Sequence, residues 1–158
     1  MSQQRLSDLA ANLDLLYEKL GNFEQALIIS ASPEQKFALQ QQIKREILPS
    51  IRRYESEYWE LYPEEAIVMP EEEAEQTVSE IERAVTVIER VDPVEYPPGM
   101  LDLLLDIRQK LDDLDSAAAA KLKVAIPIVP MLASYELEMD TENTLSQLWR
   151  SVRKRLKR

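Results

Sequence analysis

The sequence contains no cysteine and no histidine, and only two of its 158 residues are glycine. Without cysteine the chain has no disulfide, no thiolate metal site and no cysteine nucleophile, which fits a reducing compartment. Without histidine it has neither a Ser-His-Asp triad nor the Glu-x-x-His pairs of a di-iron bundle. Scarce glycine disfavours β-sandwiches, barrels and phosphate-binding loops, and it favours long helices. We therefore expect a mainly helical protein that is not an enzyme and holds no cofactor.

Long apolar runs are also missing from the sequence. The longest stretch without charge, Val124–Tyr135, is too short to span a bilayer as a helix. The first ten residues, MSQQRLSDLA, contain no apolar signal core. Apolar residues nevertheless make up 45% of the chain, enough for one domain with a real core. We expect a cytoplasmic protein.

Charge is present in excess but is unevenly spread. The net charge is −10, yet the six charged residues after Glu142 are all basic, so the rest of the chain carries −16. An acidic body argues against a nucleic-acid-binding domain, because contacts to phosphates need a basic face. The basic C-terminal segment is a separate electrostatic feature, suited to docking on the acidic body, to an acidic partner or to anionic lipid.

The N-terminal part of the chain carries one clear apolar seam. Large apolar residues recur at steps of three and four, as in a helix that packs on another helix: Leu6, Leu9, Leu13, Leu16, Leu20, Phe23 and Leu27. Ser7 is a plausible N-cap, and this helix should end near Ile29. Ser32, Pro33 and Gln35 then predict a capped restart. Similar lengths and a short link predict an antiparallel, coiled-coil-like hairpin over residues 6–62.

Several proline and acidic signals divide the rest of the chain into helices. Pro49 should kink the second helix of the hairpin. Glu71–Glu73 open a third helix, and a fourth follows the proline-rich loop that ends at Gly99. Ser116 is a candidate cap for a short turn after it. The predicted fold is an antiparallel bundle of about four helices over residues 1–120, made of the hairpin 6–62 and a helix pair over 71–120.

The last part of the chain, residues 121–158, shows a different pattern. Apolar and charged residues alternate over 121–126 and again over 135–140, which is typical of half-buried strands. Pro127 and Pro130 compromise the first of these runs. The prediction is a β-hairpin or an extended segment, packed on the bundle or tethered to it. A basic amphipathic helix should follow, capped by residues 140–142.

Two groups of residues are candidates for partner binding. The end of the second helix is rich in aromatic residues, which either close the bundle or form an exposed hot spot. The C-terminal helix places a tryptophan and four cations near one another. The candidate residues are Tyr54, Tyr58, Trp59, Tyr62, Trp149, Arg150, Arg153, Lys154 and Arg155. No acidic cluster completes a metal site, since Asp112–Asp115 lacks the glycine and glutamate of a calcium loop.

Three short blocks carry a family resemblance. They are LYEKL at 16–20, YESEYWEL at 54–61, and a C-terminal block of IPIVP at 126–130, YELEMDTE at 135–142 and LW at 148–149. Together they resemble small helical modules of cyanobacterial conflict and signalling proteins, which are often fused to STAND-type NTPases or other effector domains. The resemblance implies an adaptor role without catalytic residues. No NTPase or effector is fused here, so a signalling partner would act in trans.

Two functions follow as hypotheses. The first is a non-enzymatic helical module that binds proteins, as an adaptor or by self-association, in a bacterial signalling or conflict system. The second is a membrane-surface effector that engages anionic lipid through the basic C-terminal helix and the apolar Val124–Tyr135 run. Neither nucleic acid nor a small-molecule substrate is expected as a partner.

Overall fold

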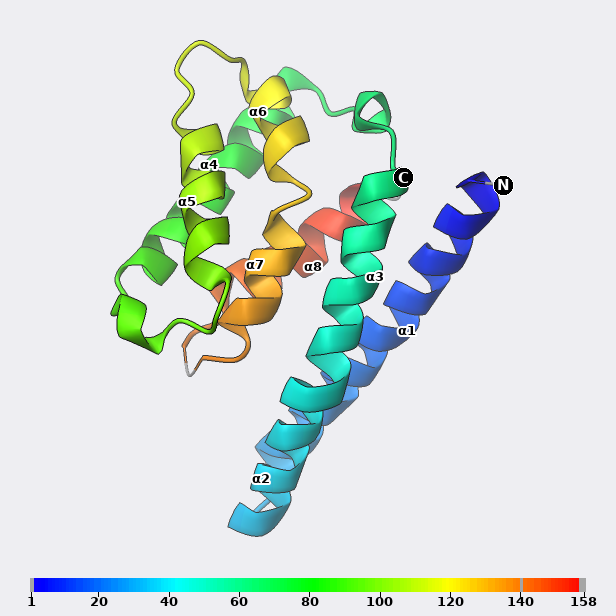
Figure 1. Ribbon diagram of the computed structural model, residues 1–158, viewed down its shortest axis with the longest axis vertical. Helices are drawn as coiled ribbons and strands as arrows, with labels where there is room; N and C mark the ends of the chain where they lie inside the picture. Colours follow the sequence, from blue (N-terminus) through cyan, green and yellow to red (C-terminus); the bar gives the residue numbers. More distant parts are fainter. Residues whose placement is uncertain (1, 140, 157–158) are drawn as a thin grey trace. The chain divides into compact units, whose positions relative to one another are not determined.

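The prediction of a mainly helical protein is confirmed. A computed structural model describes residues 2–139 and 141–156, and it contains helices and no strand in these ranges (Figure 1). The chain divides into two units, Met1–Tyr62 and Pro63–Arg158. The first unit is the predicted hairpin. The second unit contains both the expected helix pair and the C-terminal segment.

The first unit is a hairpin of two helical arms. Helix α1, Ser2–Ile29, forms one arm, and α2, Pro33–Gln42, η1, Ile43–Ile47, and α3, Leu48–Leu61, follow one another in the second. Helix α1 packs against α2, η1 and α3 (Figure 1). Because α1 begins at Ser2, Ser7 lies inside the helix and is not its N-cap.

The predicted seam holds the two arms together. Leu9, Leu13 and Leu20 of α1 are at most 1% exposed, as are Ile47 and Ile51 in the facing arm. Removing these side chains from water stabilises the hairpin by roughly 2 kcal/mol each. The rest of the seam, which includes Leu6 and Leu27, is only half-buried.

Polar contacts between the arms add specificity to the seam. The Arg5 guanidinium donates two hydrogen bonds, of 2.8 and 2.7 Å, to the Glu57 carboxylate. The Tyr17 hydroxyl donates to Oε2 of Glu55 at 2.7 Å, and Glu55 is only 1% exposed. A buried carboxylate with a fixed donor penalises any sliding of the arms, because a shifted register would leave the charge without this bond.

Hydrogen bonds between nearby residues account for the turn of the hairpin and for the proline in its second arm. The Ser32 hydroxyl accepts a hydrogen bond from the Gln35 amide, and Pro33 occupies the start of α2, as predicted. Pro49 has no amide hydrogen to give to the carbonyl four residues before it. The chain accommodates this with a π-helical turn, in which the Leu48 amide bonds to the Ile43 carbonyl. The helix type changes at this point, and the arm continues beyond it.

Gly21 lies in the interior of α1 and is a weak point of the hairpin. A β-carbon built at Gly21 meets no atom within 4 Å, so alanine fits without strain. We expect Gly21→Ala to raise the free energy of unfolding by about 0.5–1 kcal/mol, because glycine loses more backbone entropy in a helix. Urea denaturation followed by circular dichroism measures this. A destabilised Gly21→Ala variant would contradict the open environment of this position.

In its described residues, 63–139 and 141–156, the second unit contains five α-helices that share one core. They are α4, Glu71–Glu89, α5, Met100–Leu111, α6, Ala118–Ala125, α7, Val129–Glu136, and α8, Thr144–Leu156, with short turns η2, Glu64–Ala66, and η3, Pro93–Glu95. Helix α4 packs on α5, α6 and α8, while α7 packs on α5 and α8. The positions of α4 and α5 agree with the helix pair expected over 71–120. At the start of α5, Gly99 adopts φ +90°, which favours glycine.

The prediction of a β-hairpin or an extended segment over 121–140 is wrong for the described residues of this segment. They form α6 and α7 and a short turn. Pro130 lies in the first turn of α7, where proline is tolerated in a helix. Burial is not confined to one side of these helices, because Ile128, Pro130 and Ser134 are buried in addition to Leu122, Ala125, Ile126, Val129, Leu132, Ala133 and Glu136, which follow a helical spacing. The apparent alternation arose because these short helices are buried on more than one side.

Candidate interaction surfaces

The aromatic residues at the end of α3 form a ring cluster. The Trp59 ring lies edge-on to Tyr58 at 5.0 Å between centroids, and Tyr62 stacks on Tyr58 at 5.4 Å. The Arg53 guanidinium lies 5.1 Å from the centre of the Tyr54 ring. All four predicted aromatic residues are half-buried. The structure thus brings Tyr58, Trp59 and Tyr62 into contact with one another, whereas the Tyr54 ring contacts the Arg53 guanidinium.

The predicted residues of α8 separate into a buried face and a basic face. Trp149 is 1% exposed and lies in the core, so it is not available to a partner in this structure. Arg150, Arg153 and Arg155 are half-buried, and Lys154 is exposed. The Arg155 guanidinium lies 3.8 Å from the Glu80 carboxylate on α4. The basic helix therefore docks on an acidic helix of its own unit.

A buried carboxylate fixes the N-terminus of α8. Glu136, at the end of α7, is 1% exposed and accepts hydrogen bonds from the amides of Ser146 at 2.9 Å and Leu145 at 3.4 Å. These amides belong to the first turn of α8 and have no partner within the helix. Sequence reasoning expected the cap within 140–142. Asp140 lies outside the described residues, and the carboxylate that bonds these amides comes from the preceding helix.

Burial raises the pKa of the Glu136 carboxyl, although the amides of Ser146 and Leu145 act in the opposite direction. A raised pKa in the folded state means that the unfolded chain loses this proton first as the pH rises. Stability should therefore fall as the pH rises from the ordinary glutamate pKa towards the raised one, and level off above it. Denaturant unfolding across this pH range should show this fall in the native chain and not in Glu136→Gln. Parallel pH profiles would contradict the prediction.

A second carboxylate caps α6 in the same way. Glu71, at the start of α4, accepts hydrogen bonds from the amides of Ala118 at 2.7 Å and Ala119 at 3.1 Å. The expectation that Ser116 caps this helix is wrong, since its hydroxyl donates to Asp113 at 2.6 Å. No local pattern reveals such caps, because acceptor and amides lie 47 and 48 residues apart.

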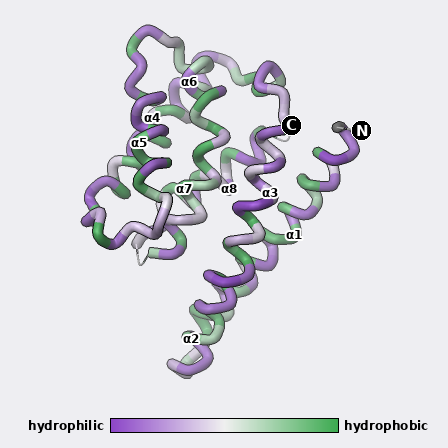
Figure 2. Tube along the Cα trace, in the orientation of Figure 1, coloured by the Kyte–Doolittle hydropathy of each residue, from purple (hydrophilic) through white to green (hydrophobic). Residues whose placement is uncertain are grey.

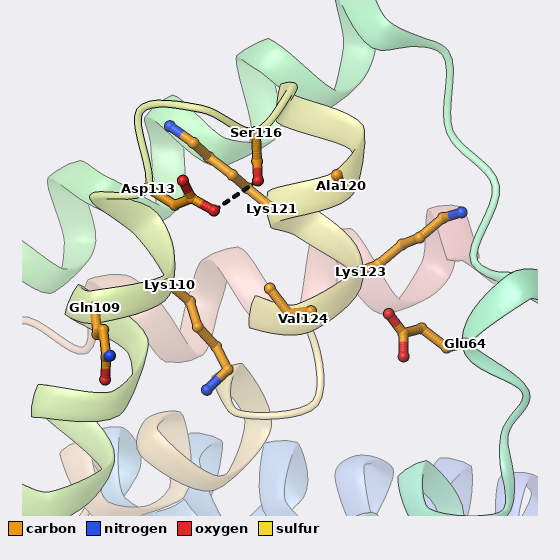
Figure 3. A pocket seen from close by; sticks show the side chains of 9 residues that line it. All are labelled: Glu64, Gln109, Lys110, Asp113, Ser116, Ala120, Lys121, Lys123 and Val124. Atoms are coloured by element: carbon orange, nitrogen blue, oxygen red, sulfur yellow. Dashed lines mark hydrogen bonds between the residues drawn. The ribbon is translucent and has the colours of Figure 1, made fainter.

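A pocket of about 530 Å³ opens beside α5 and α6 (Figure 3). Seven of its nine lining residues have polar or charged side chains: Glu64, Gln109, Lys110, Asp113, Ser116, Lys121 and Lys123. Three lysines in an acidic chain suggest an anion site, but Figure 3 shows their side chains pointing in three different directions. Because their ammonium groups do not converge, they do not form a cradle for one phosphate or carboxylate.

Large apolar side chains are exposed or only half-buried near the turn of the hairpin. The leucine spacing places some of them in the seam, and the others are not part of any predicted site. None of residues 21–42 is buried. Ile28 and Ile29 are 83% and 81% exposed at the end of α1, and Phe37 on α2 is 62% exposed. Phe23, Leu27 and Leu39 are half-buried. Figure 2 shows hydrophobic residues along both arms towards the turn. We call residues 21–42 the turn end.

Neither metal binding nor a membrane span has a clear basis in the described residues. In residues 2–139 and 141–156, no group of three or more acidic side chains is placed to hold a metal ion. No single helix within these ranges is long and apolar enough to cross a bilayer. Helices α6 and α7 pass by length and composition only as a pair bent by 58°. Most of their apolar side chains lie in the core of the second unit.

Comparison of the chain with protein-family models, with curated proteins and with solved structures finds no match.

Proposed function

We propose that this protein is a non-enzymatic helical module that acts by binding other proteins. The observation that carries the proposal is the turn end, where no residue is buried although six large apolar side chains are present. Large apolar side chains gathered in one exposed region are typical of interaction sites. The side chains of Ile28, Ile29 and Phe37 are already exposed, so a partner can contact them without any rearrangement of the hairpin.

The charge distribution supports the same region as the binding surface. Residues 1–62 contain seven basic and nine acidic residues, a net charge of −2, whereas residues 63–158 carry −8. The only charged residues of the turn end are Glu24, Glu34 and Lys36. A near-neutral apolar surface suits a protein partner, because its desolvation cost is low. By the resemblance described above, the module would belong to a signalling system that contains an NTPase or another effector in trans.

Capture from native lysate tests the proposal. The immobilised native chain should retain a defined partner, and Ile28→Asp/Phe37→Asp should lose it, since both positions are more than 60% exposed and tolerate aspartate without unfolding. Leu114→Asp, at a position 93% exposed in the second unit, is the matched control. If the native chain neither self-associates nor retains a partner, the proposal is wrong.

The membrane-surface hypothesis has less support from this geometry. Interfacial helices need a free apolar face, and in α8 Leu145, Trp149 and Val152 are at most 1% exposed. We expect sedimentation with vesicles to be weak, and to be the same for vesicles rich or poor in anionic lipid. Changing Arg153, Lys154 and Arg155 to glutamate should leave the sedimentation of the chain with vesicles unaltered. Binding that rises with anionic lipid and falls with these changes would revive the hypothesis.

A further inference from the structure

We infer that the partner of the turn end is a second copy of this chain, which makes the protein a homodimer joined through its helical hairpins. The inference rests on the proposed function and names the occupant of its binding surface. Two hairpins meeting at residues 21–42 would form a local antiparallel four-helix arrangement. Each copy would cover the apolar side chains that the other leaves in water.

The contrast between the two ends of the hairpin carries the first step. Between residues 9 and 20, and again between 43 and 55, the arms contain fully buried side chains. Between residues 21 and 42 they contain none, although the arms still pack as a pair. A pair of helices covers only one stripe on each helix, and a large apolar side chain off that stripe needs a further helix to cover it. Ile28, Ile29 and Phe37 are such side chains.

The charge of the turn end disfavours a strongly acidic or basic partner and is compatible with a second copy. Two identical chains of net charge −10 repel one another, and most of this charge lies in residues 63–158. The turn end carries only −1, so it offers a meeting surface with little like-charge repulsion. In a dimer with a two-fold axis, the same apolar patch of each copy faces the patch of the other. Such an interface therefore needs no second binding surface elsewhere on the chain.

The available area matches a weak dimer. From their exposed fractions, Ile28, Ile29 and Phe37, with their half-buried neighbours, offer on the order of 600 Å² in each copy. Two copies would bury about 1,200 Å², the low end of specific interfaces. Because salt screens the repulsion between the acidic units, higher salt should strengthen the dimer.

Sedimentation velocity of the full chain over a concentration series tests the inference. The native chain should shift from monomer to dimer, and Ile28→Asp/Phe37→Asp should weaken the dimer by about tenfold or more. Val94→Asp and Leu114→Asp, at 90% and 93% exposed positions outside the turn end, should not weaken it. Circular dichroism confirms that each variant is folded.

Cysteine cross-linking locates the interface, because the chain has no native cysteine. Under mild oxidation Ala31→Cys, at the exposed link between the arms, should form a disulfide dimer, while Val94→Cys should remain reduced. Cross-linking at both sites equally, or a dimer that survives Ile28→Asp/Phe37→Asp, would overturn the inference.

The outcomes separate this inference from the proposed function. A native chain that stays monomeric, yet retains a partner that the Ile28→Asp/Phe37→Asp variant loses, would overturn dimerisation and leave the interaction module standing. A monomer that sediments with neutral phosphatidylcholine vesicles through the same residues would overturn both in favour of lipid. A monomer that binds neither would also overturn both.

Discussion

Replacing Trp149 with alanine is expected to lower the free energy of unfolding by about 3–5 kcal/mol. Trp149 is 1% exposed and is the largest fully buried side chain among the described residues. It projects from α8, which packs on both α4 and α7. Its removal would therefore leave a large cavity in a small core that close packing otherwise fills.

Denaturant unfolding followed by circular dichroism measures this loss. Leu114→Ala is the matched control, since Leu114 is 93% exposed and its truncation should change stability by less than about 0.5 kcal/mol. A Trp149→Ala variant that loses less than about 1 kcal/mol would mean that α8 does not dock as described. The tail would then be free to engage lipid.

Replacing Glu136 with alanine should cost about 2–4 kcal/mol of stability. The change leaves the amides of Leu145 and Ser146 without their carboxylate acceptor, in surroundings from which water is largely absent. A buried donor without a partner costs the full desolvation of its N–H group. The first turn of α8 also loses the negative charge that complements the helix dipole.

Glu142→Ala provides the comparison for this second change. Glu142 is exposed and lies just before the same helix, so its removal should alter stability by less than about 0.5 kcal/mol. The stability of Glu136→Gln should lie between those of Glu136→Ala and Glu142→Ala, because the glutamine amide keeps one acceptor oxygen. Equal stabilities for Glu136→Ala and Glu142→Ala would show that the contact with α8 contributes nothing.

Signals confined to a few consecutive residues were interpreted correctly from the sequence. The leucine spacing of α1 predicted a hairpin over 6–62, and Ser32 and Pro33 marked the start of its second arm. These features follow from helical periodicity and from capping, which act over a few residues. The α6–α7 segment was misread because its burial on several sides removes the periodic contrast that such an interpretation needs.

The partner-binding residues are harder to predict from the sequence, because the sequence does not show which side chains the folded chain buries. Trp149 and the half-buried aromatic residues of α3 have the composition of a hot spot, but composition does not state which side chains the rest of the chain covers. The spacing predicts that Phe23 and Leu27 belong to the seam, but spacing does not show where the facing arm stops covering the seam. The exposure of the turn end became visible only once both arms were placed.

The sequence by itself determined that the chain is helical, that its N-terminal part forms a hairpin, and where the acidic and basic residues fall, because these properties depend on composition and short-range periodicity. Only the tertiary structure decided that Glu71 and Glu136 bond the amides that begin α6 and α8, that Trp149 is core, and that residues 21–42 stay uncovered. Each of these depends on which distant surfaces meet, and burial and long-range hydrogen bonds are not encoded in any single stretch of the chain.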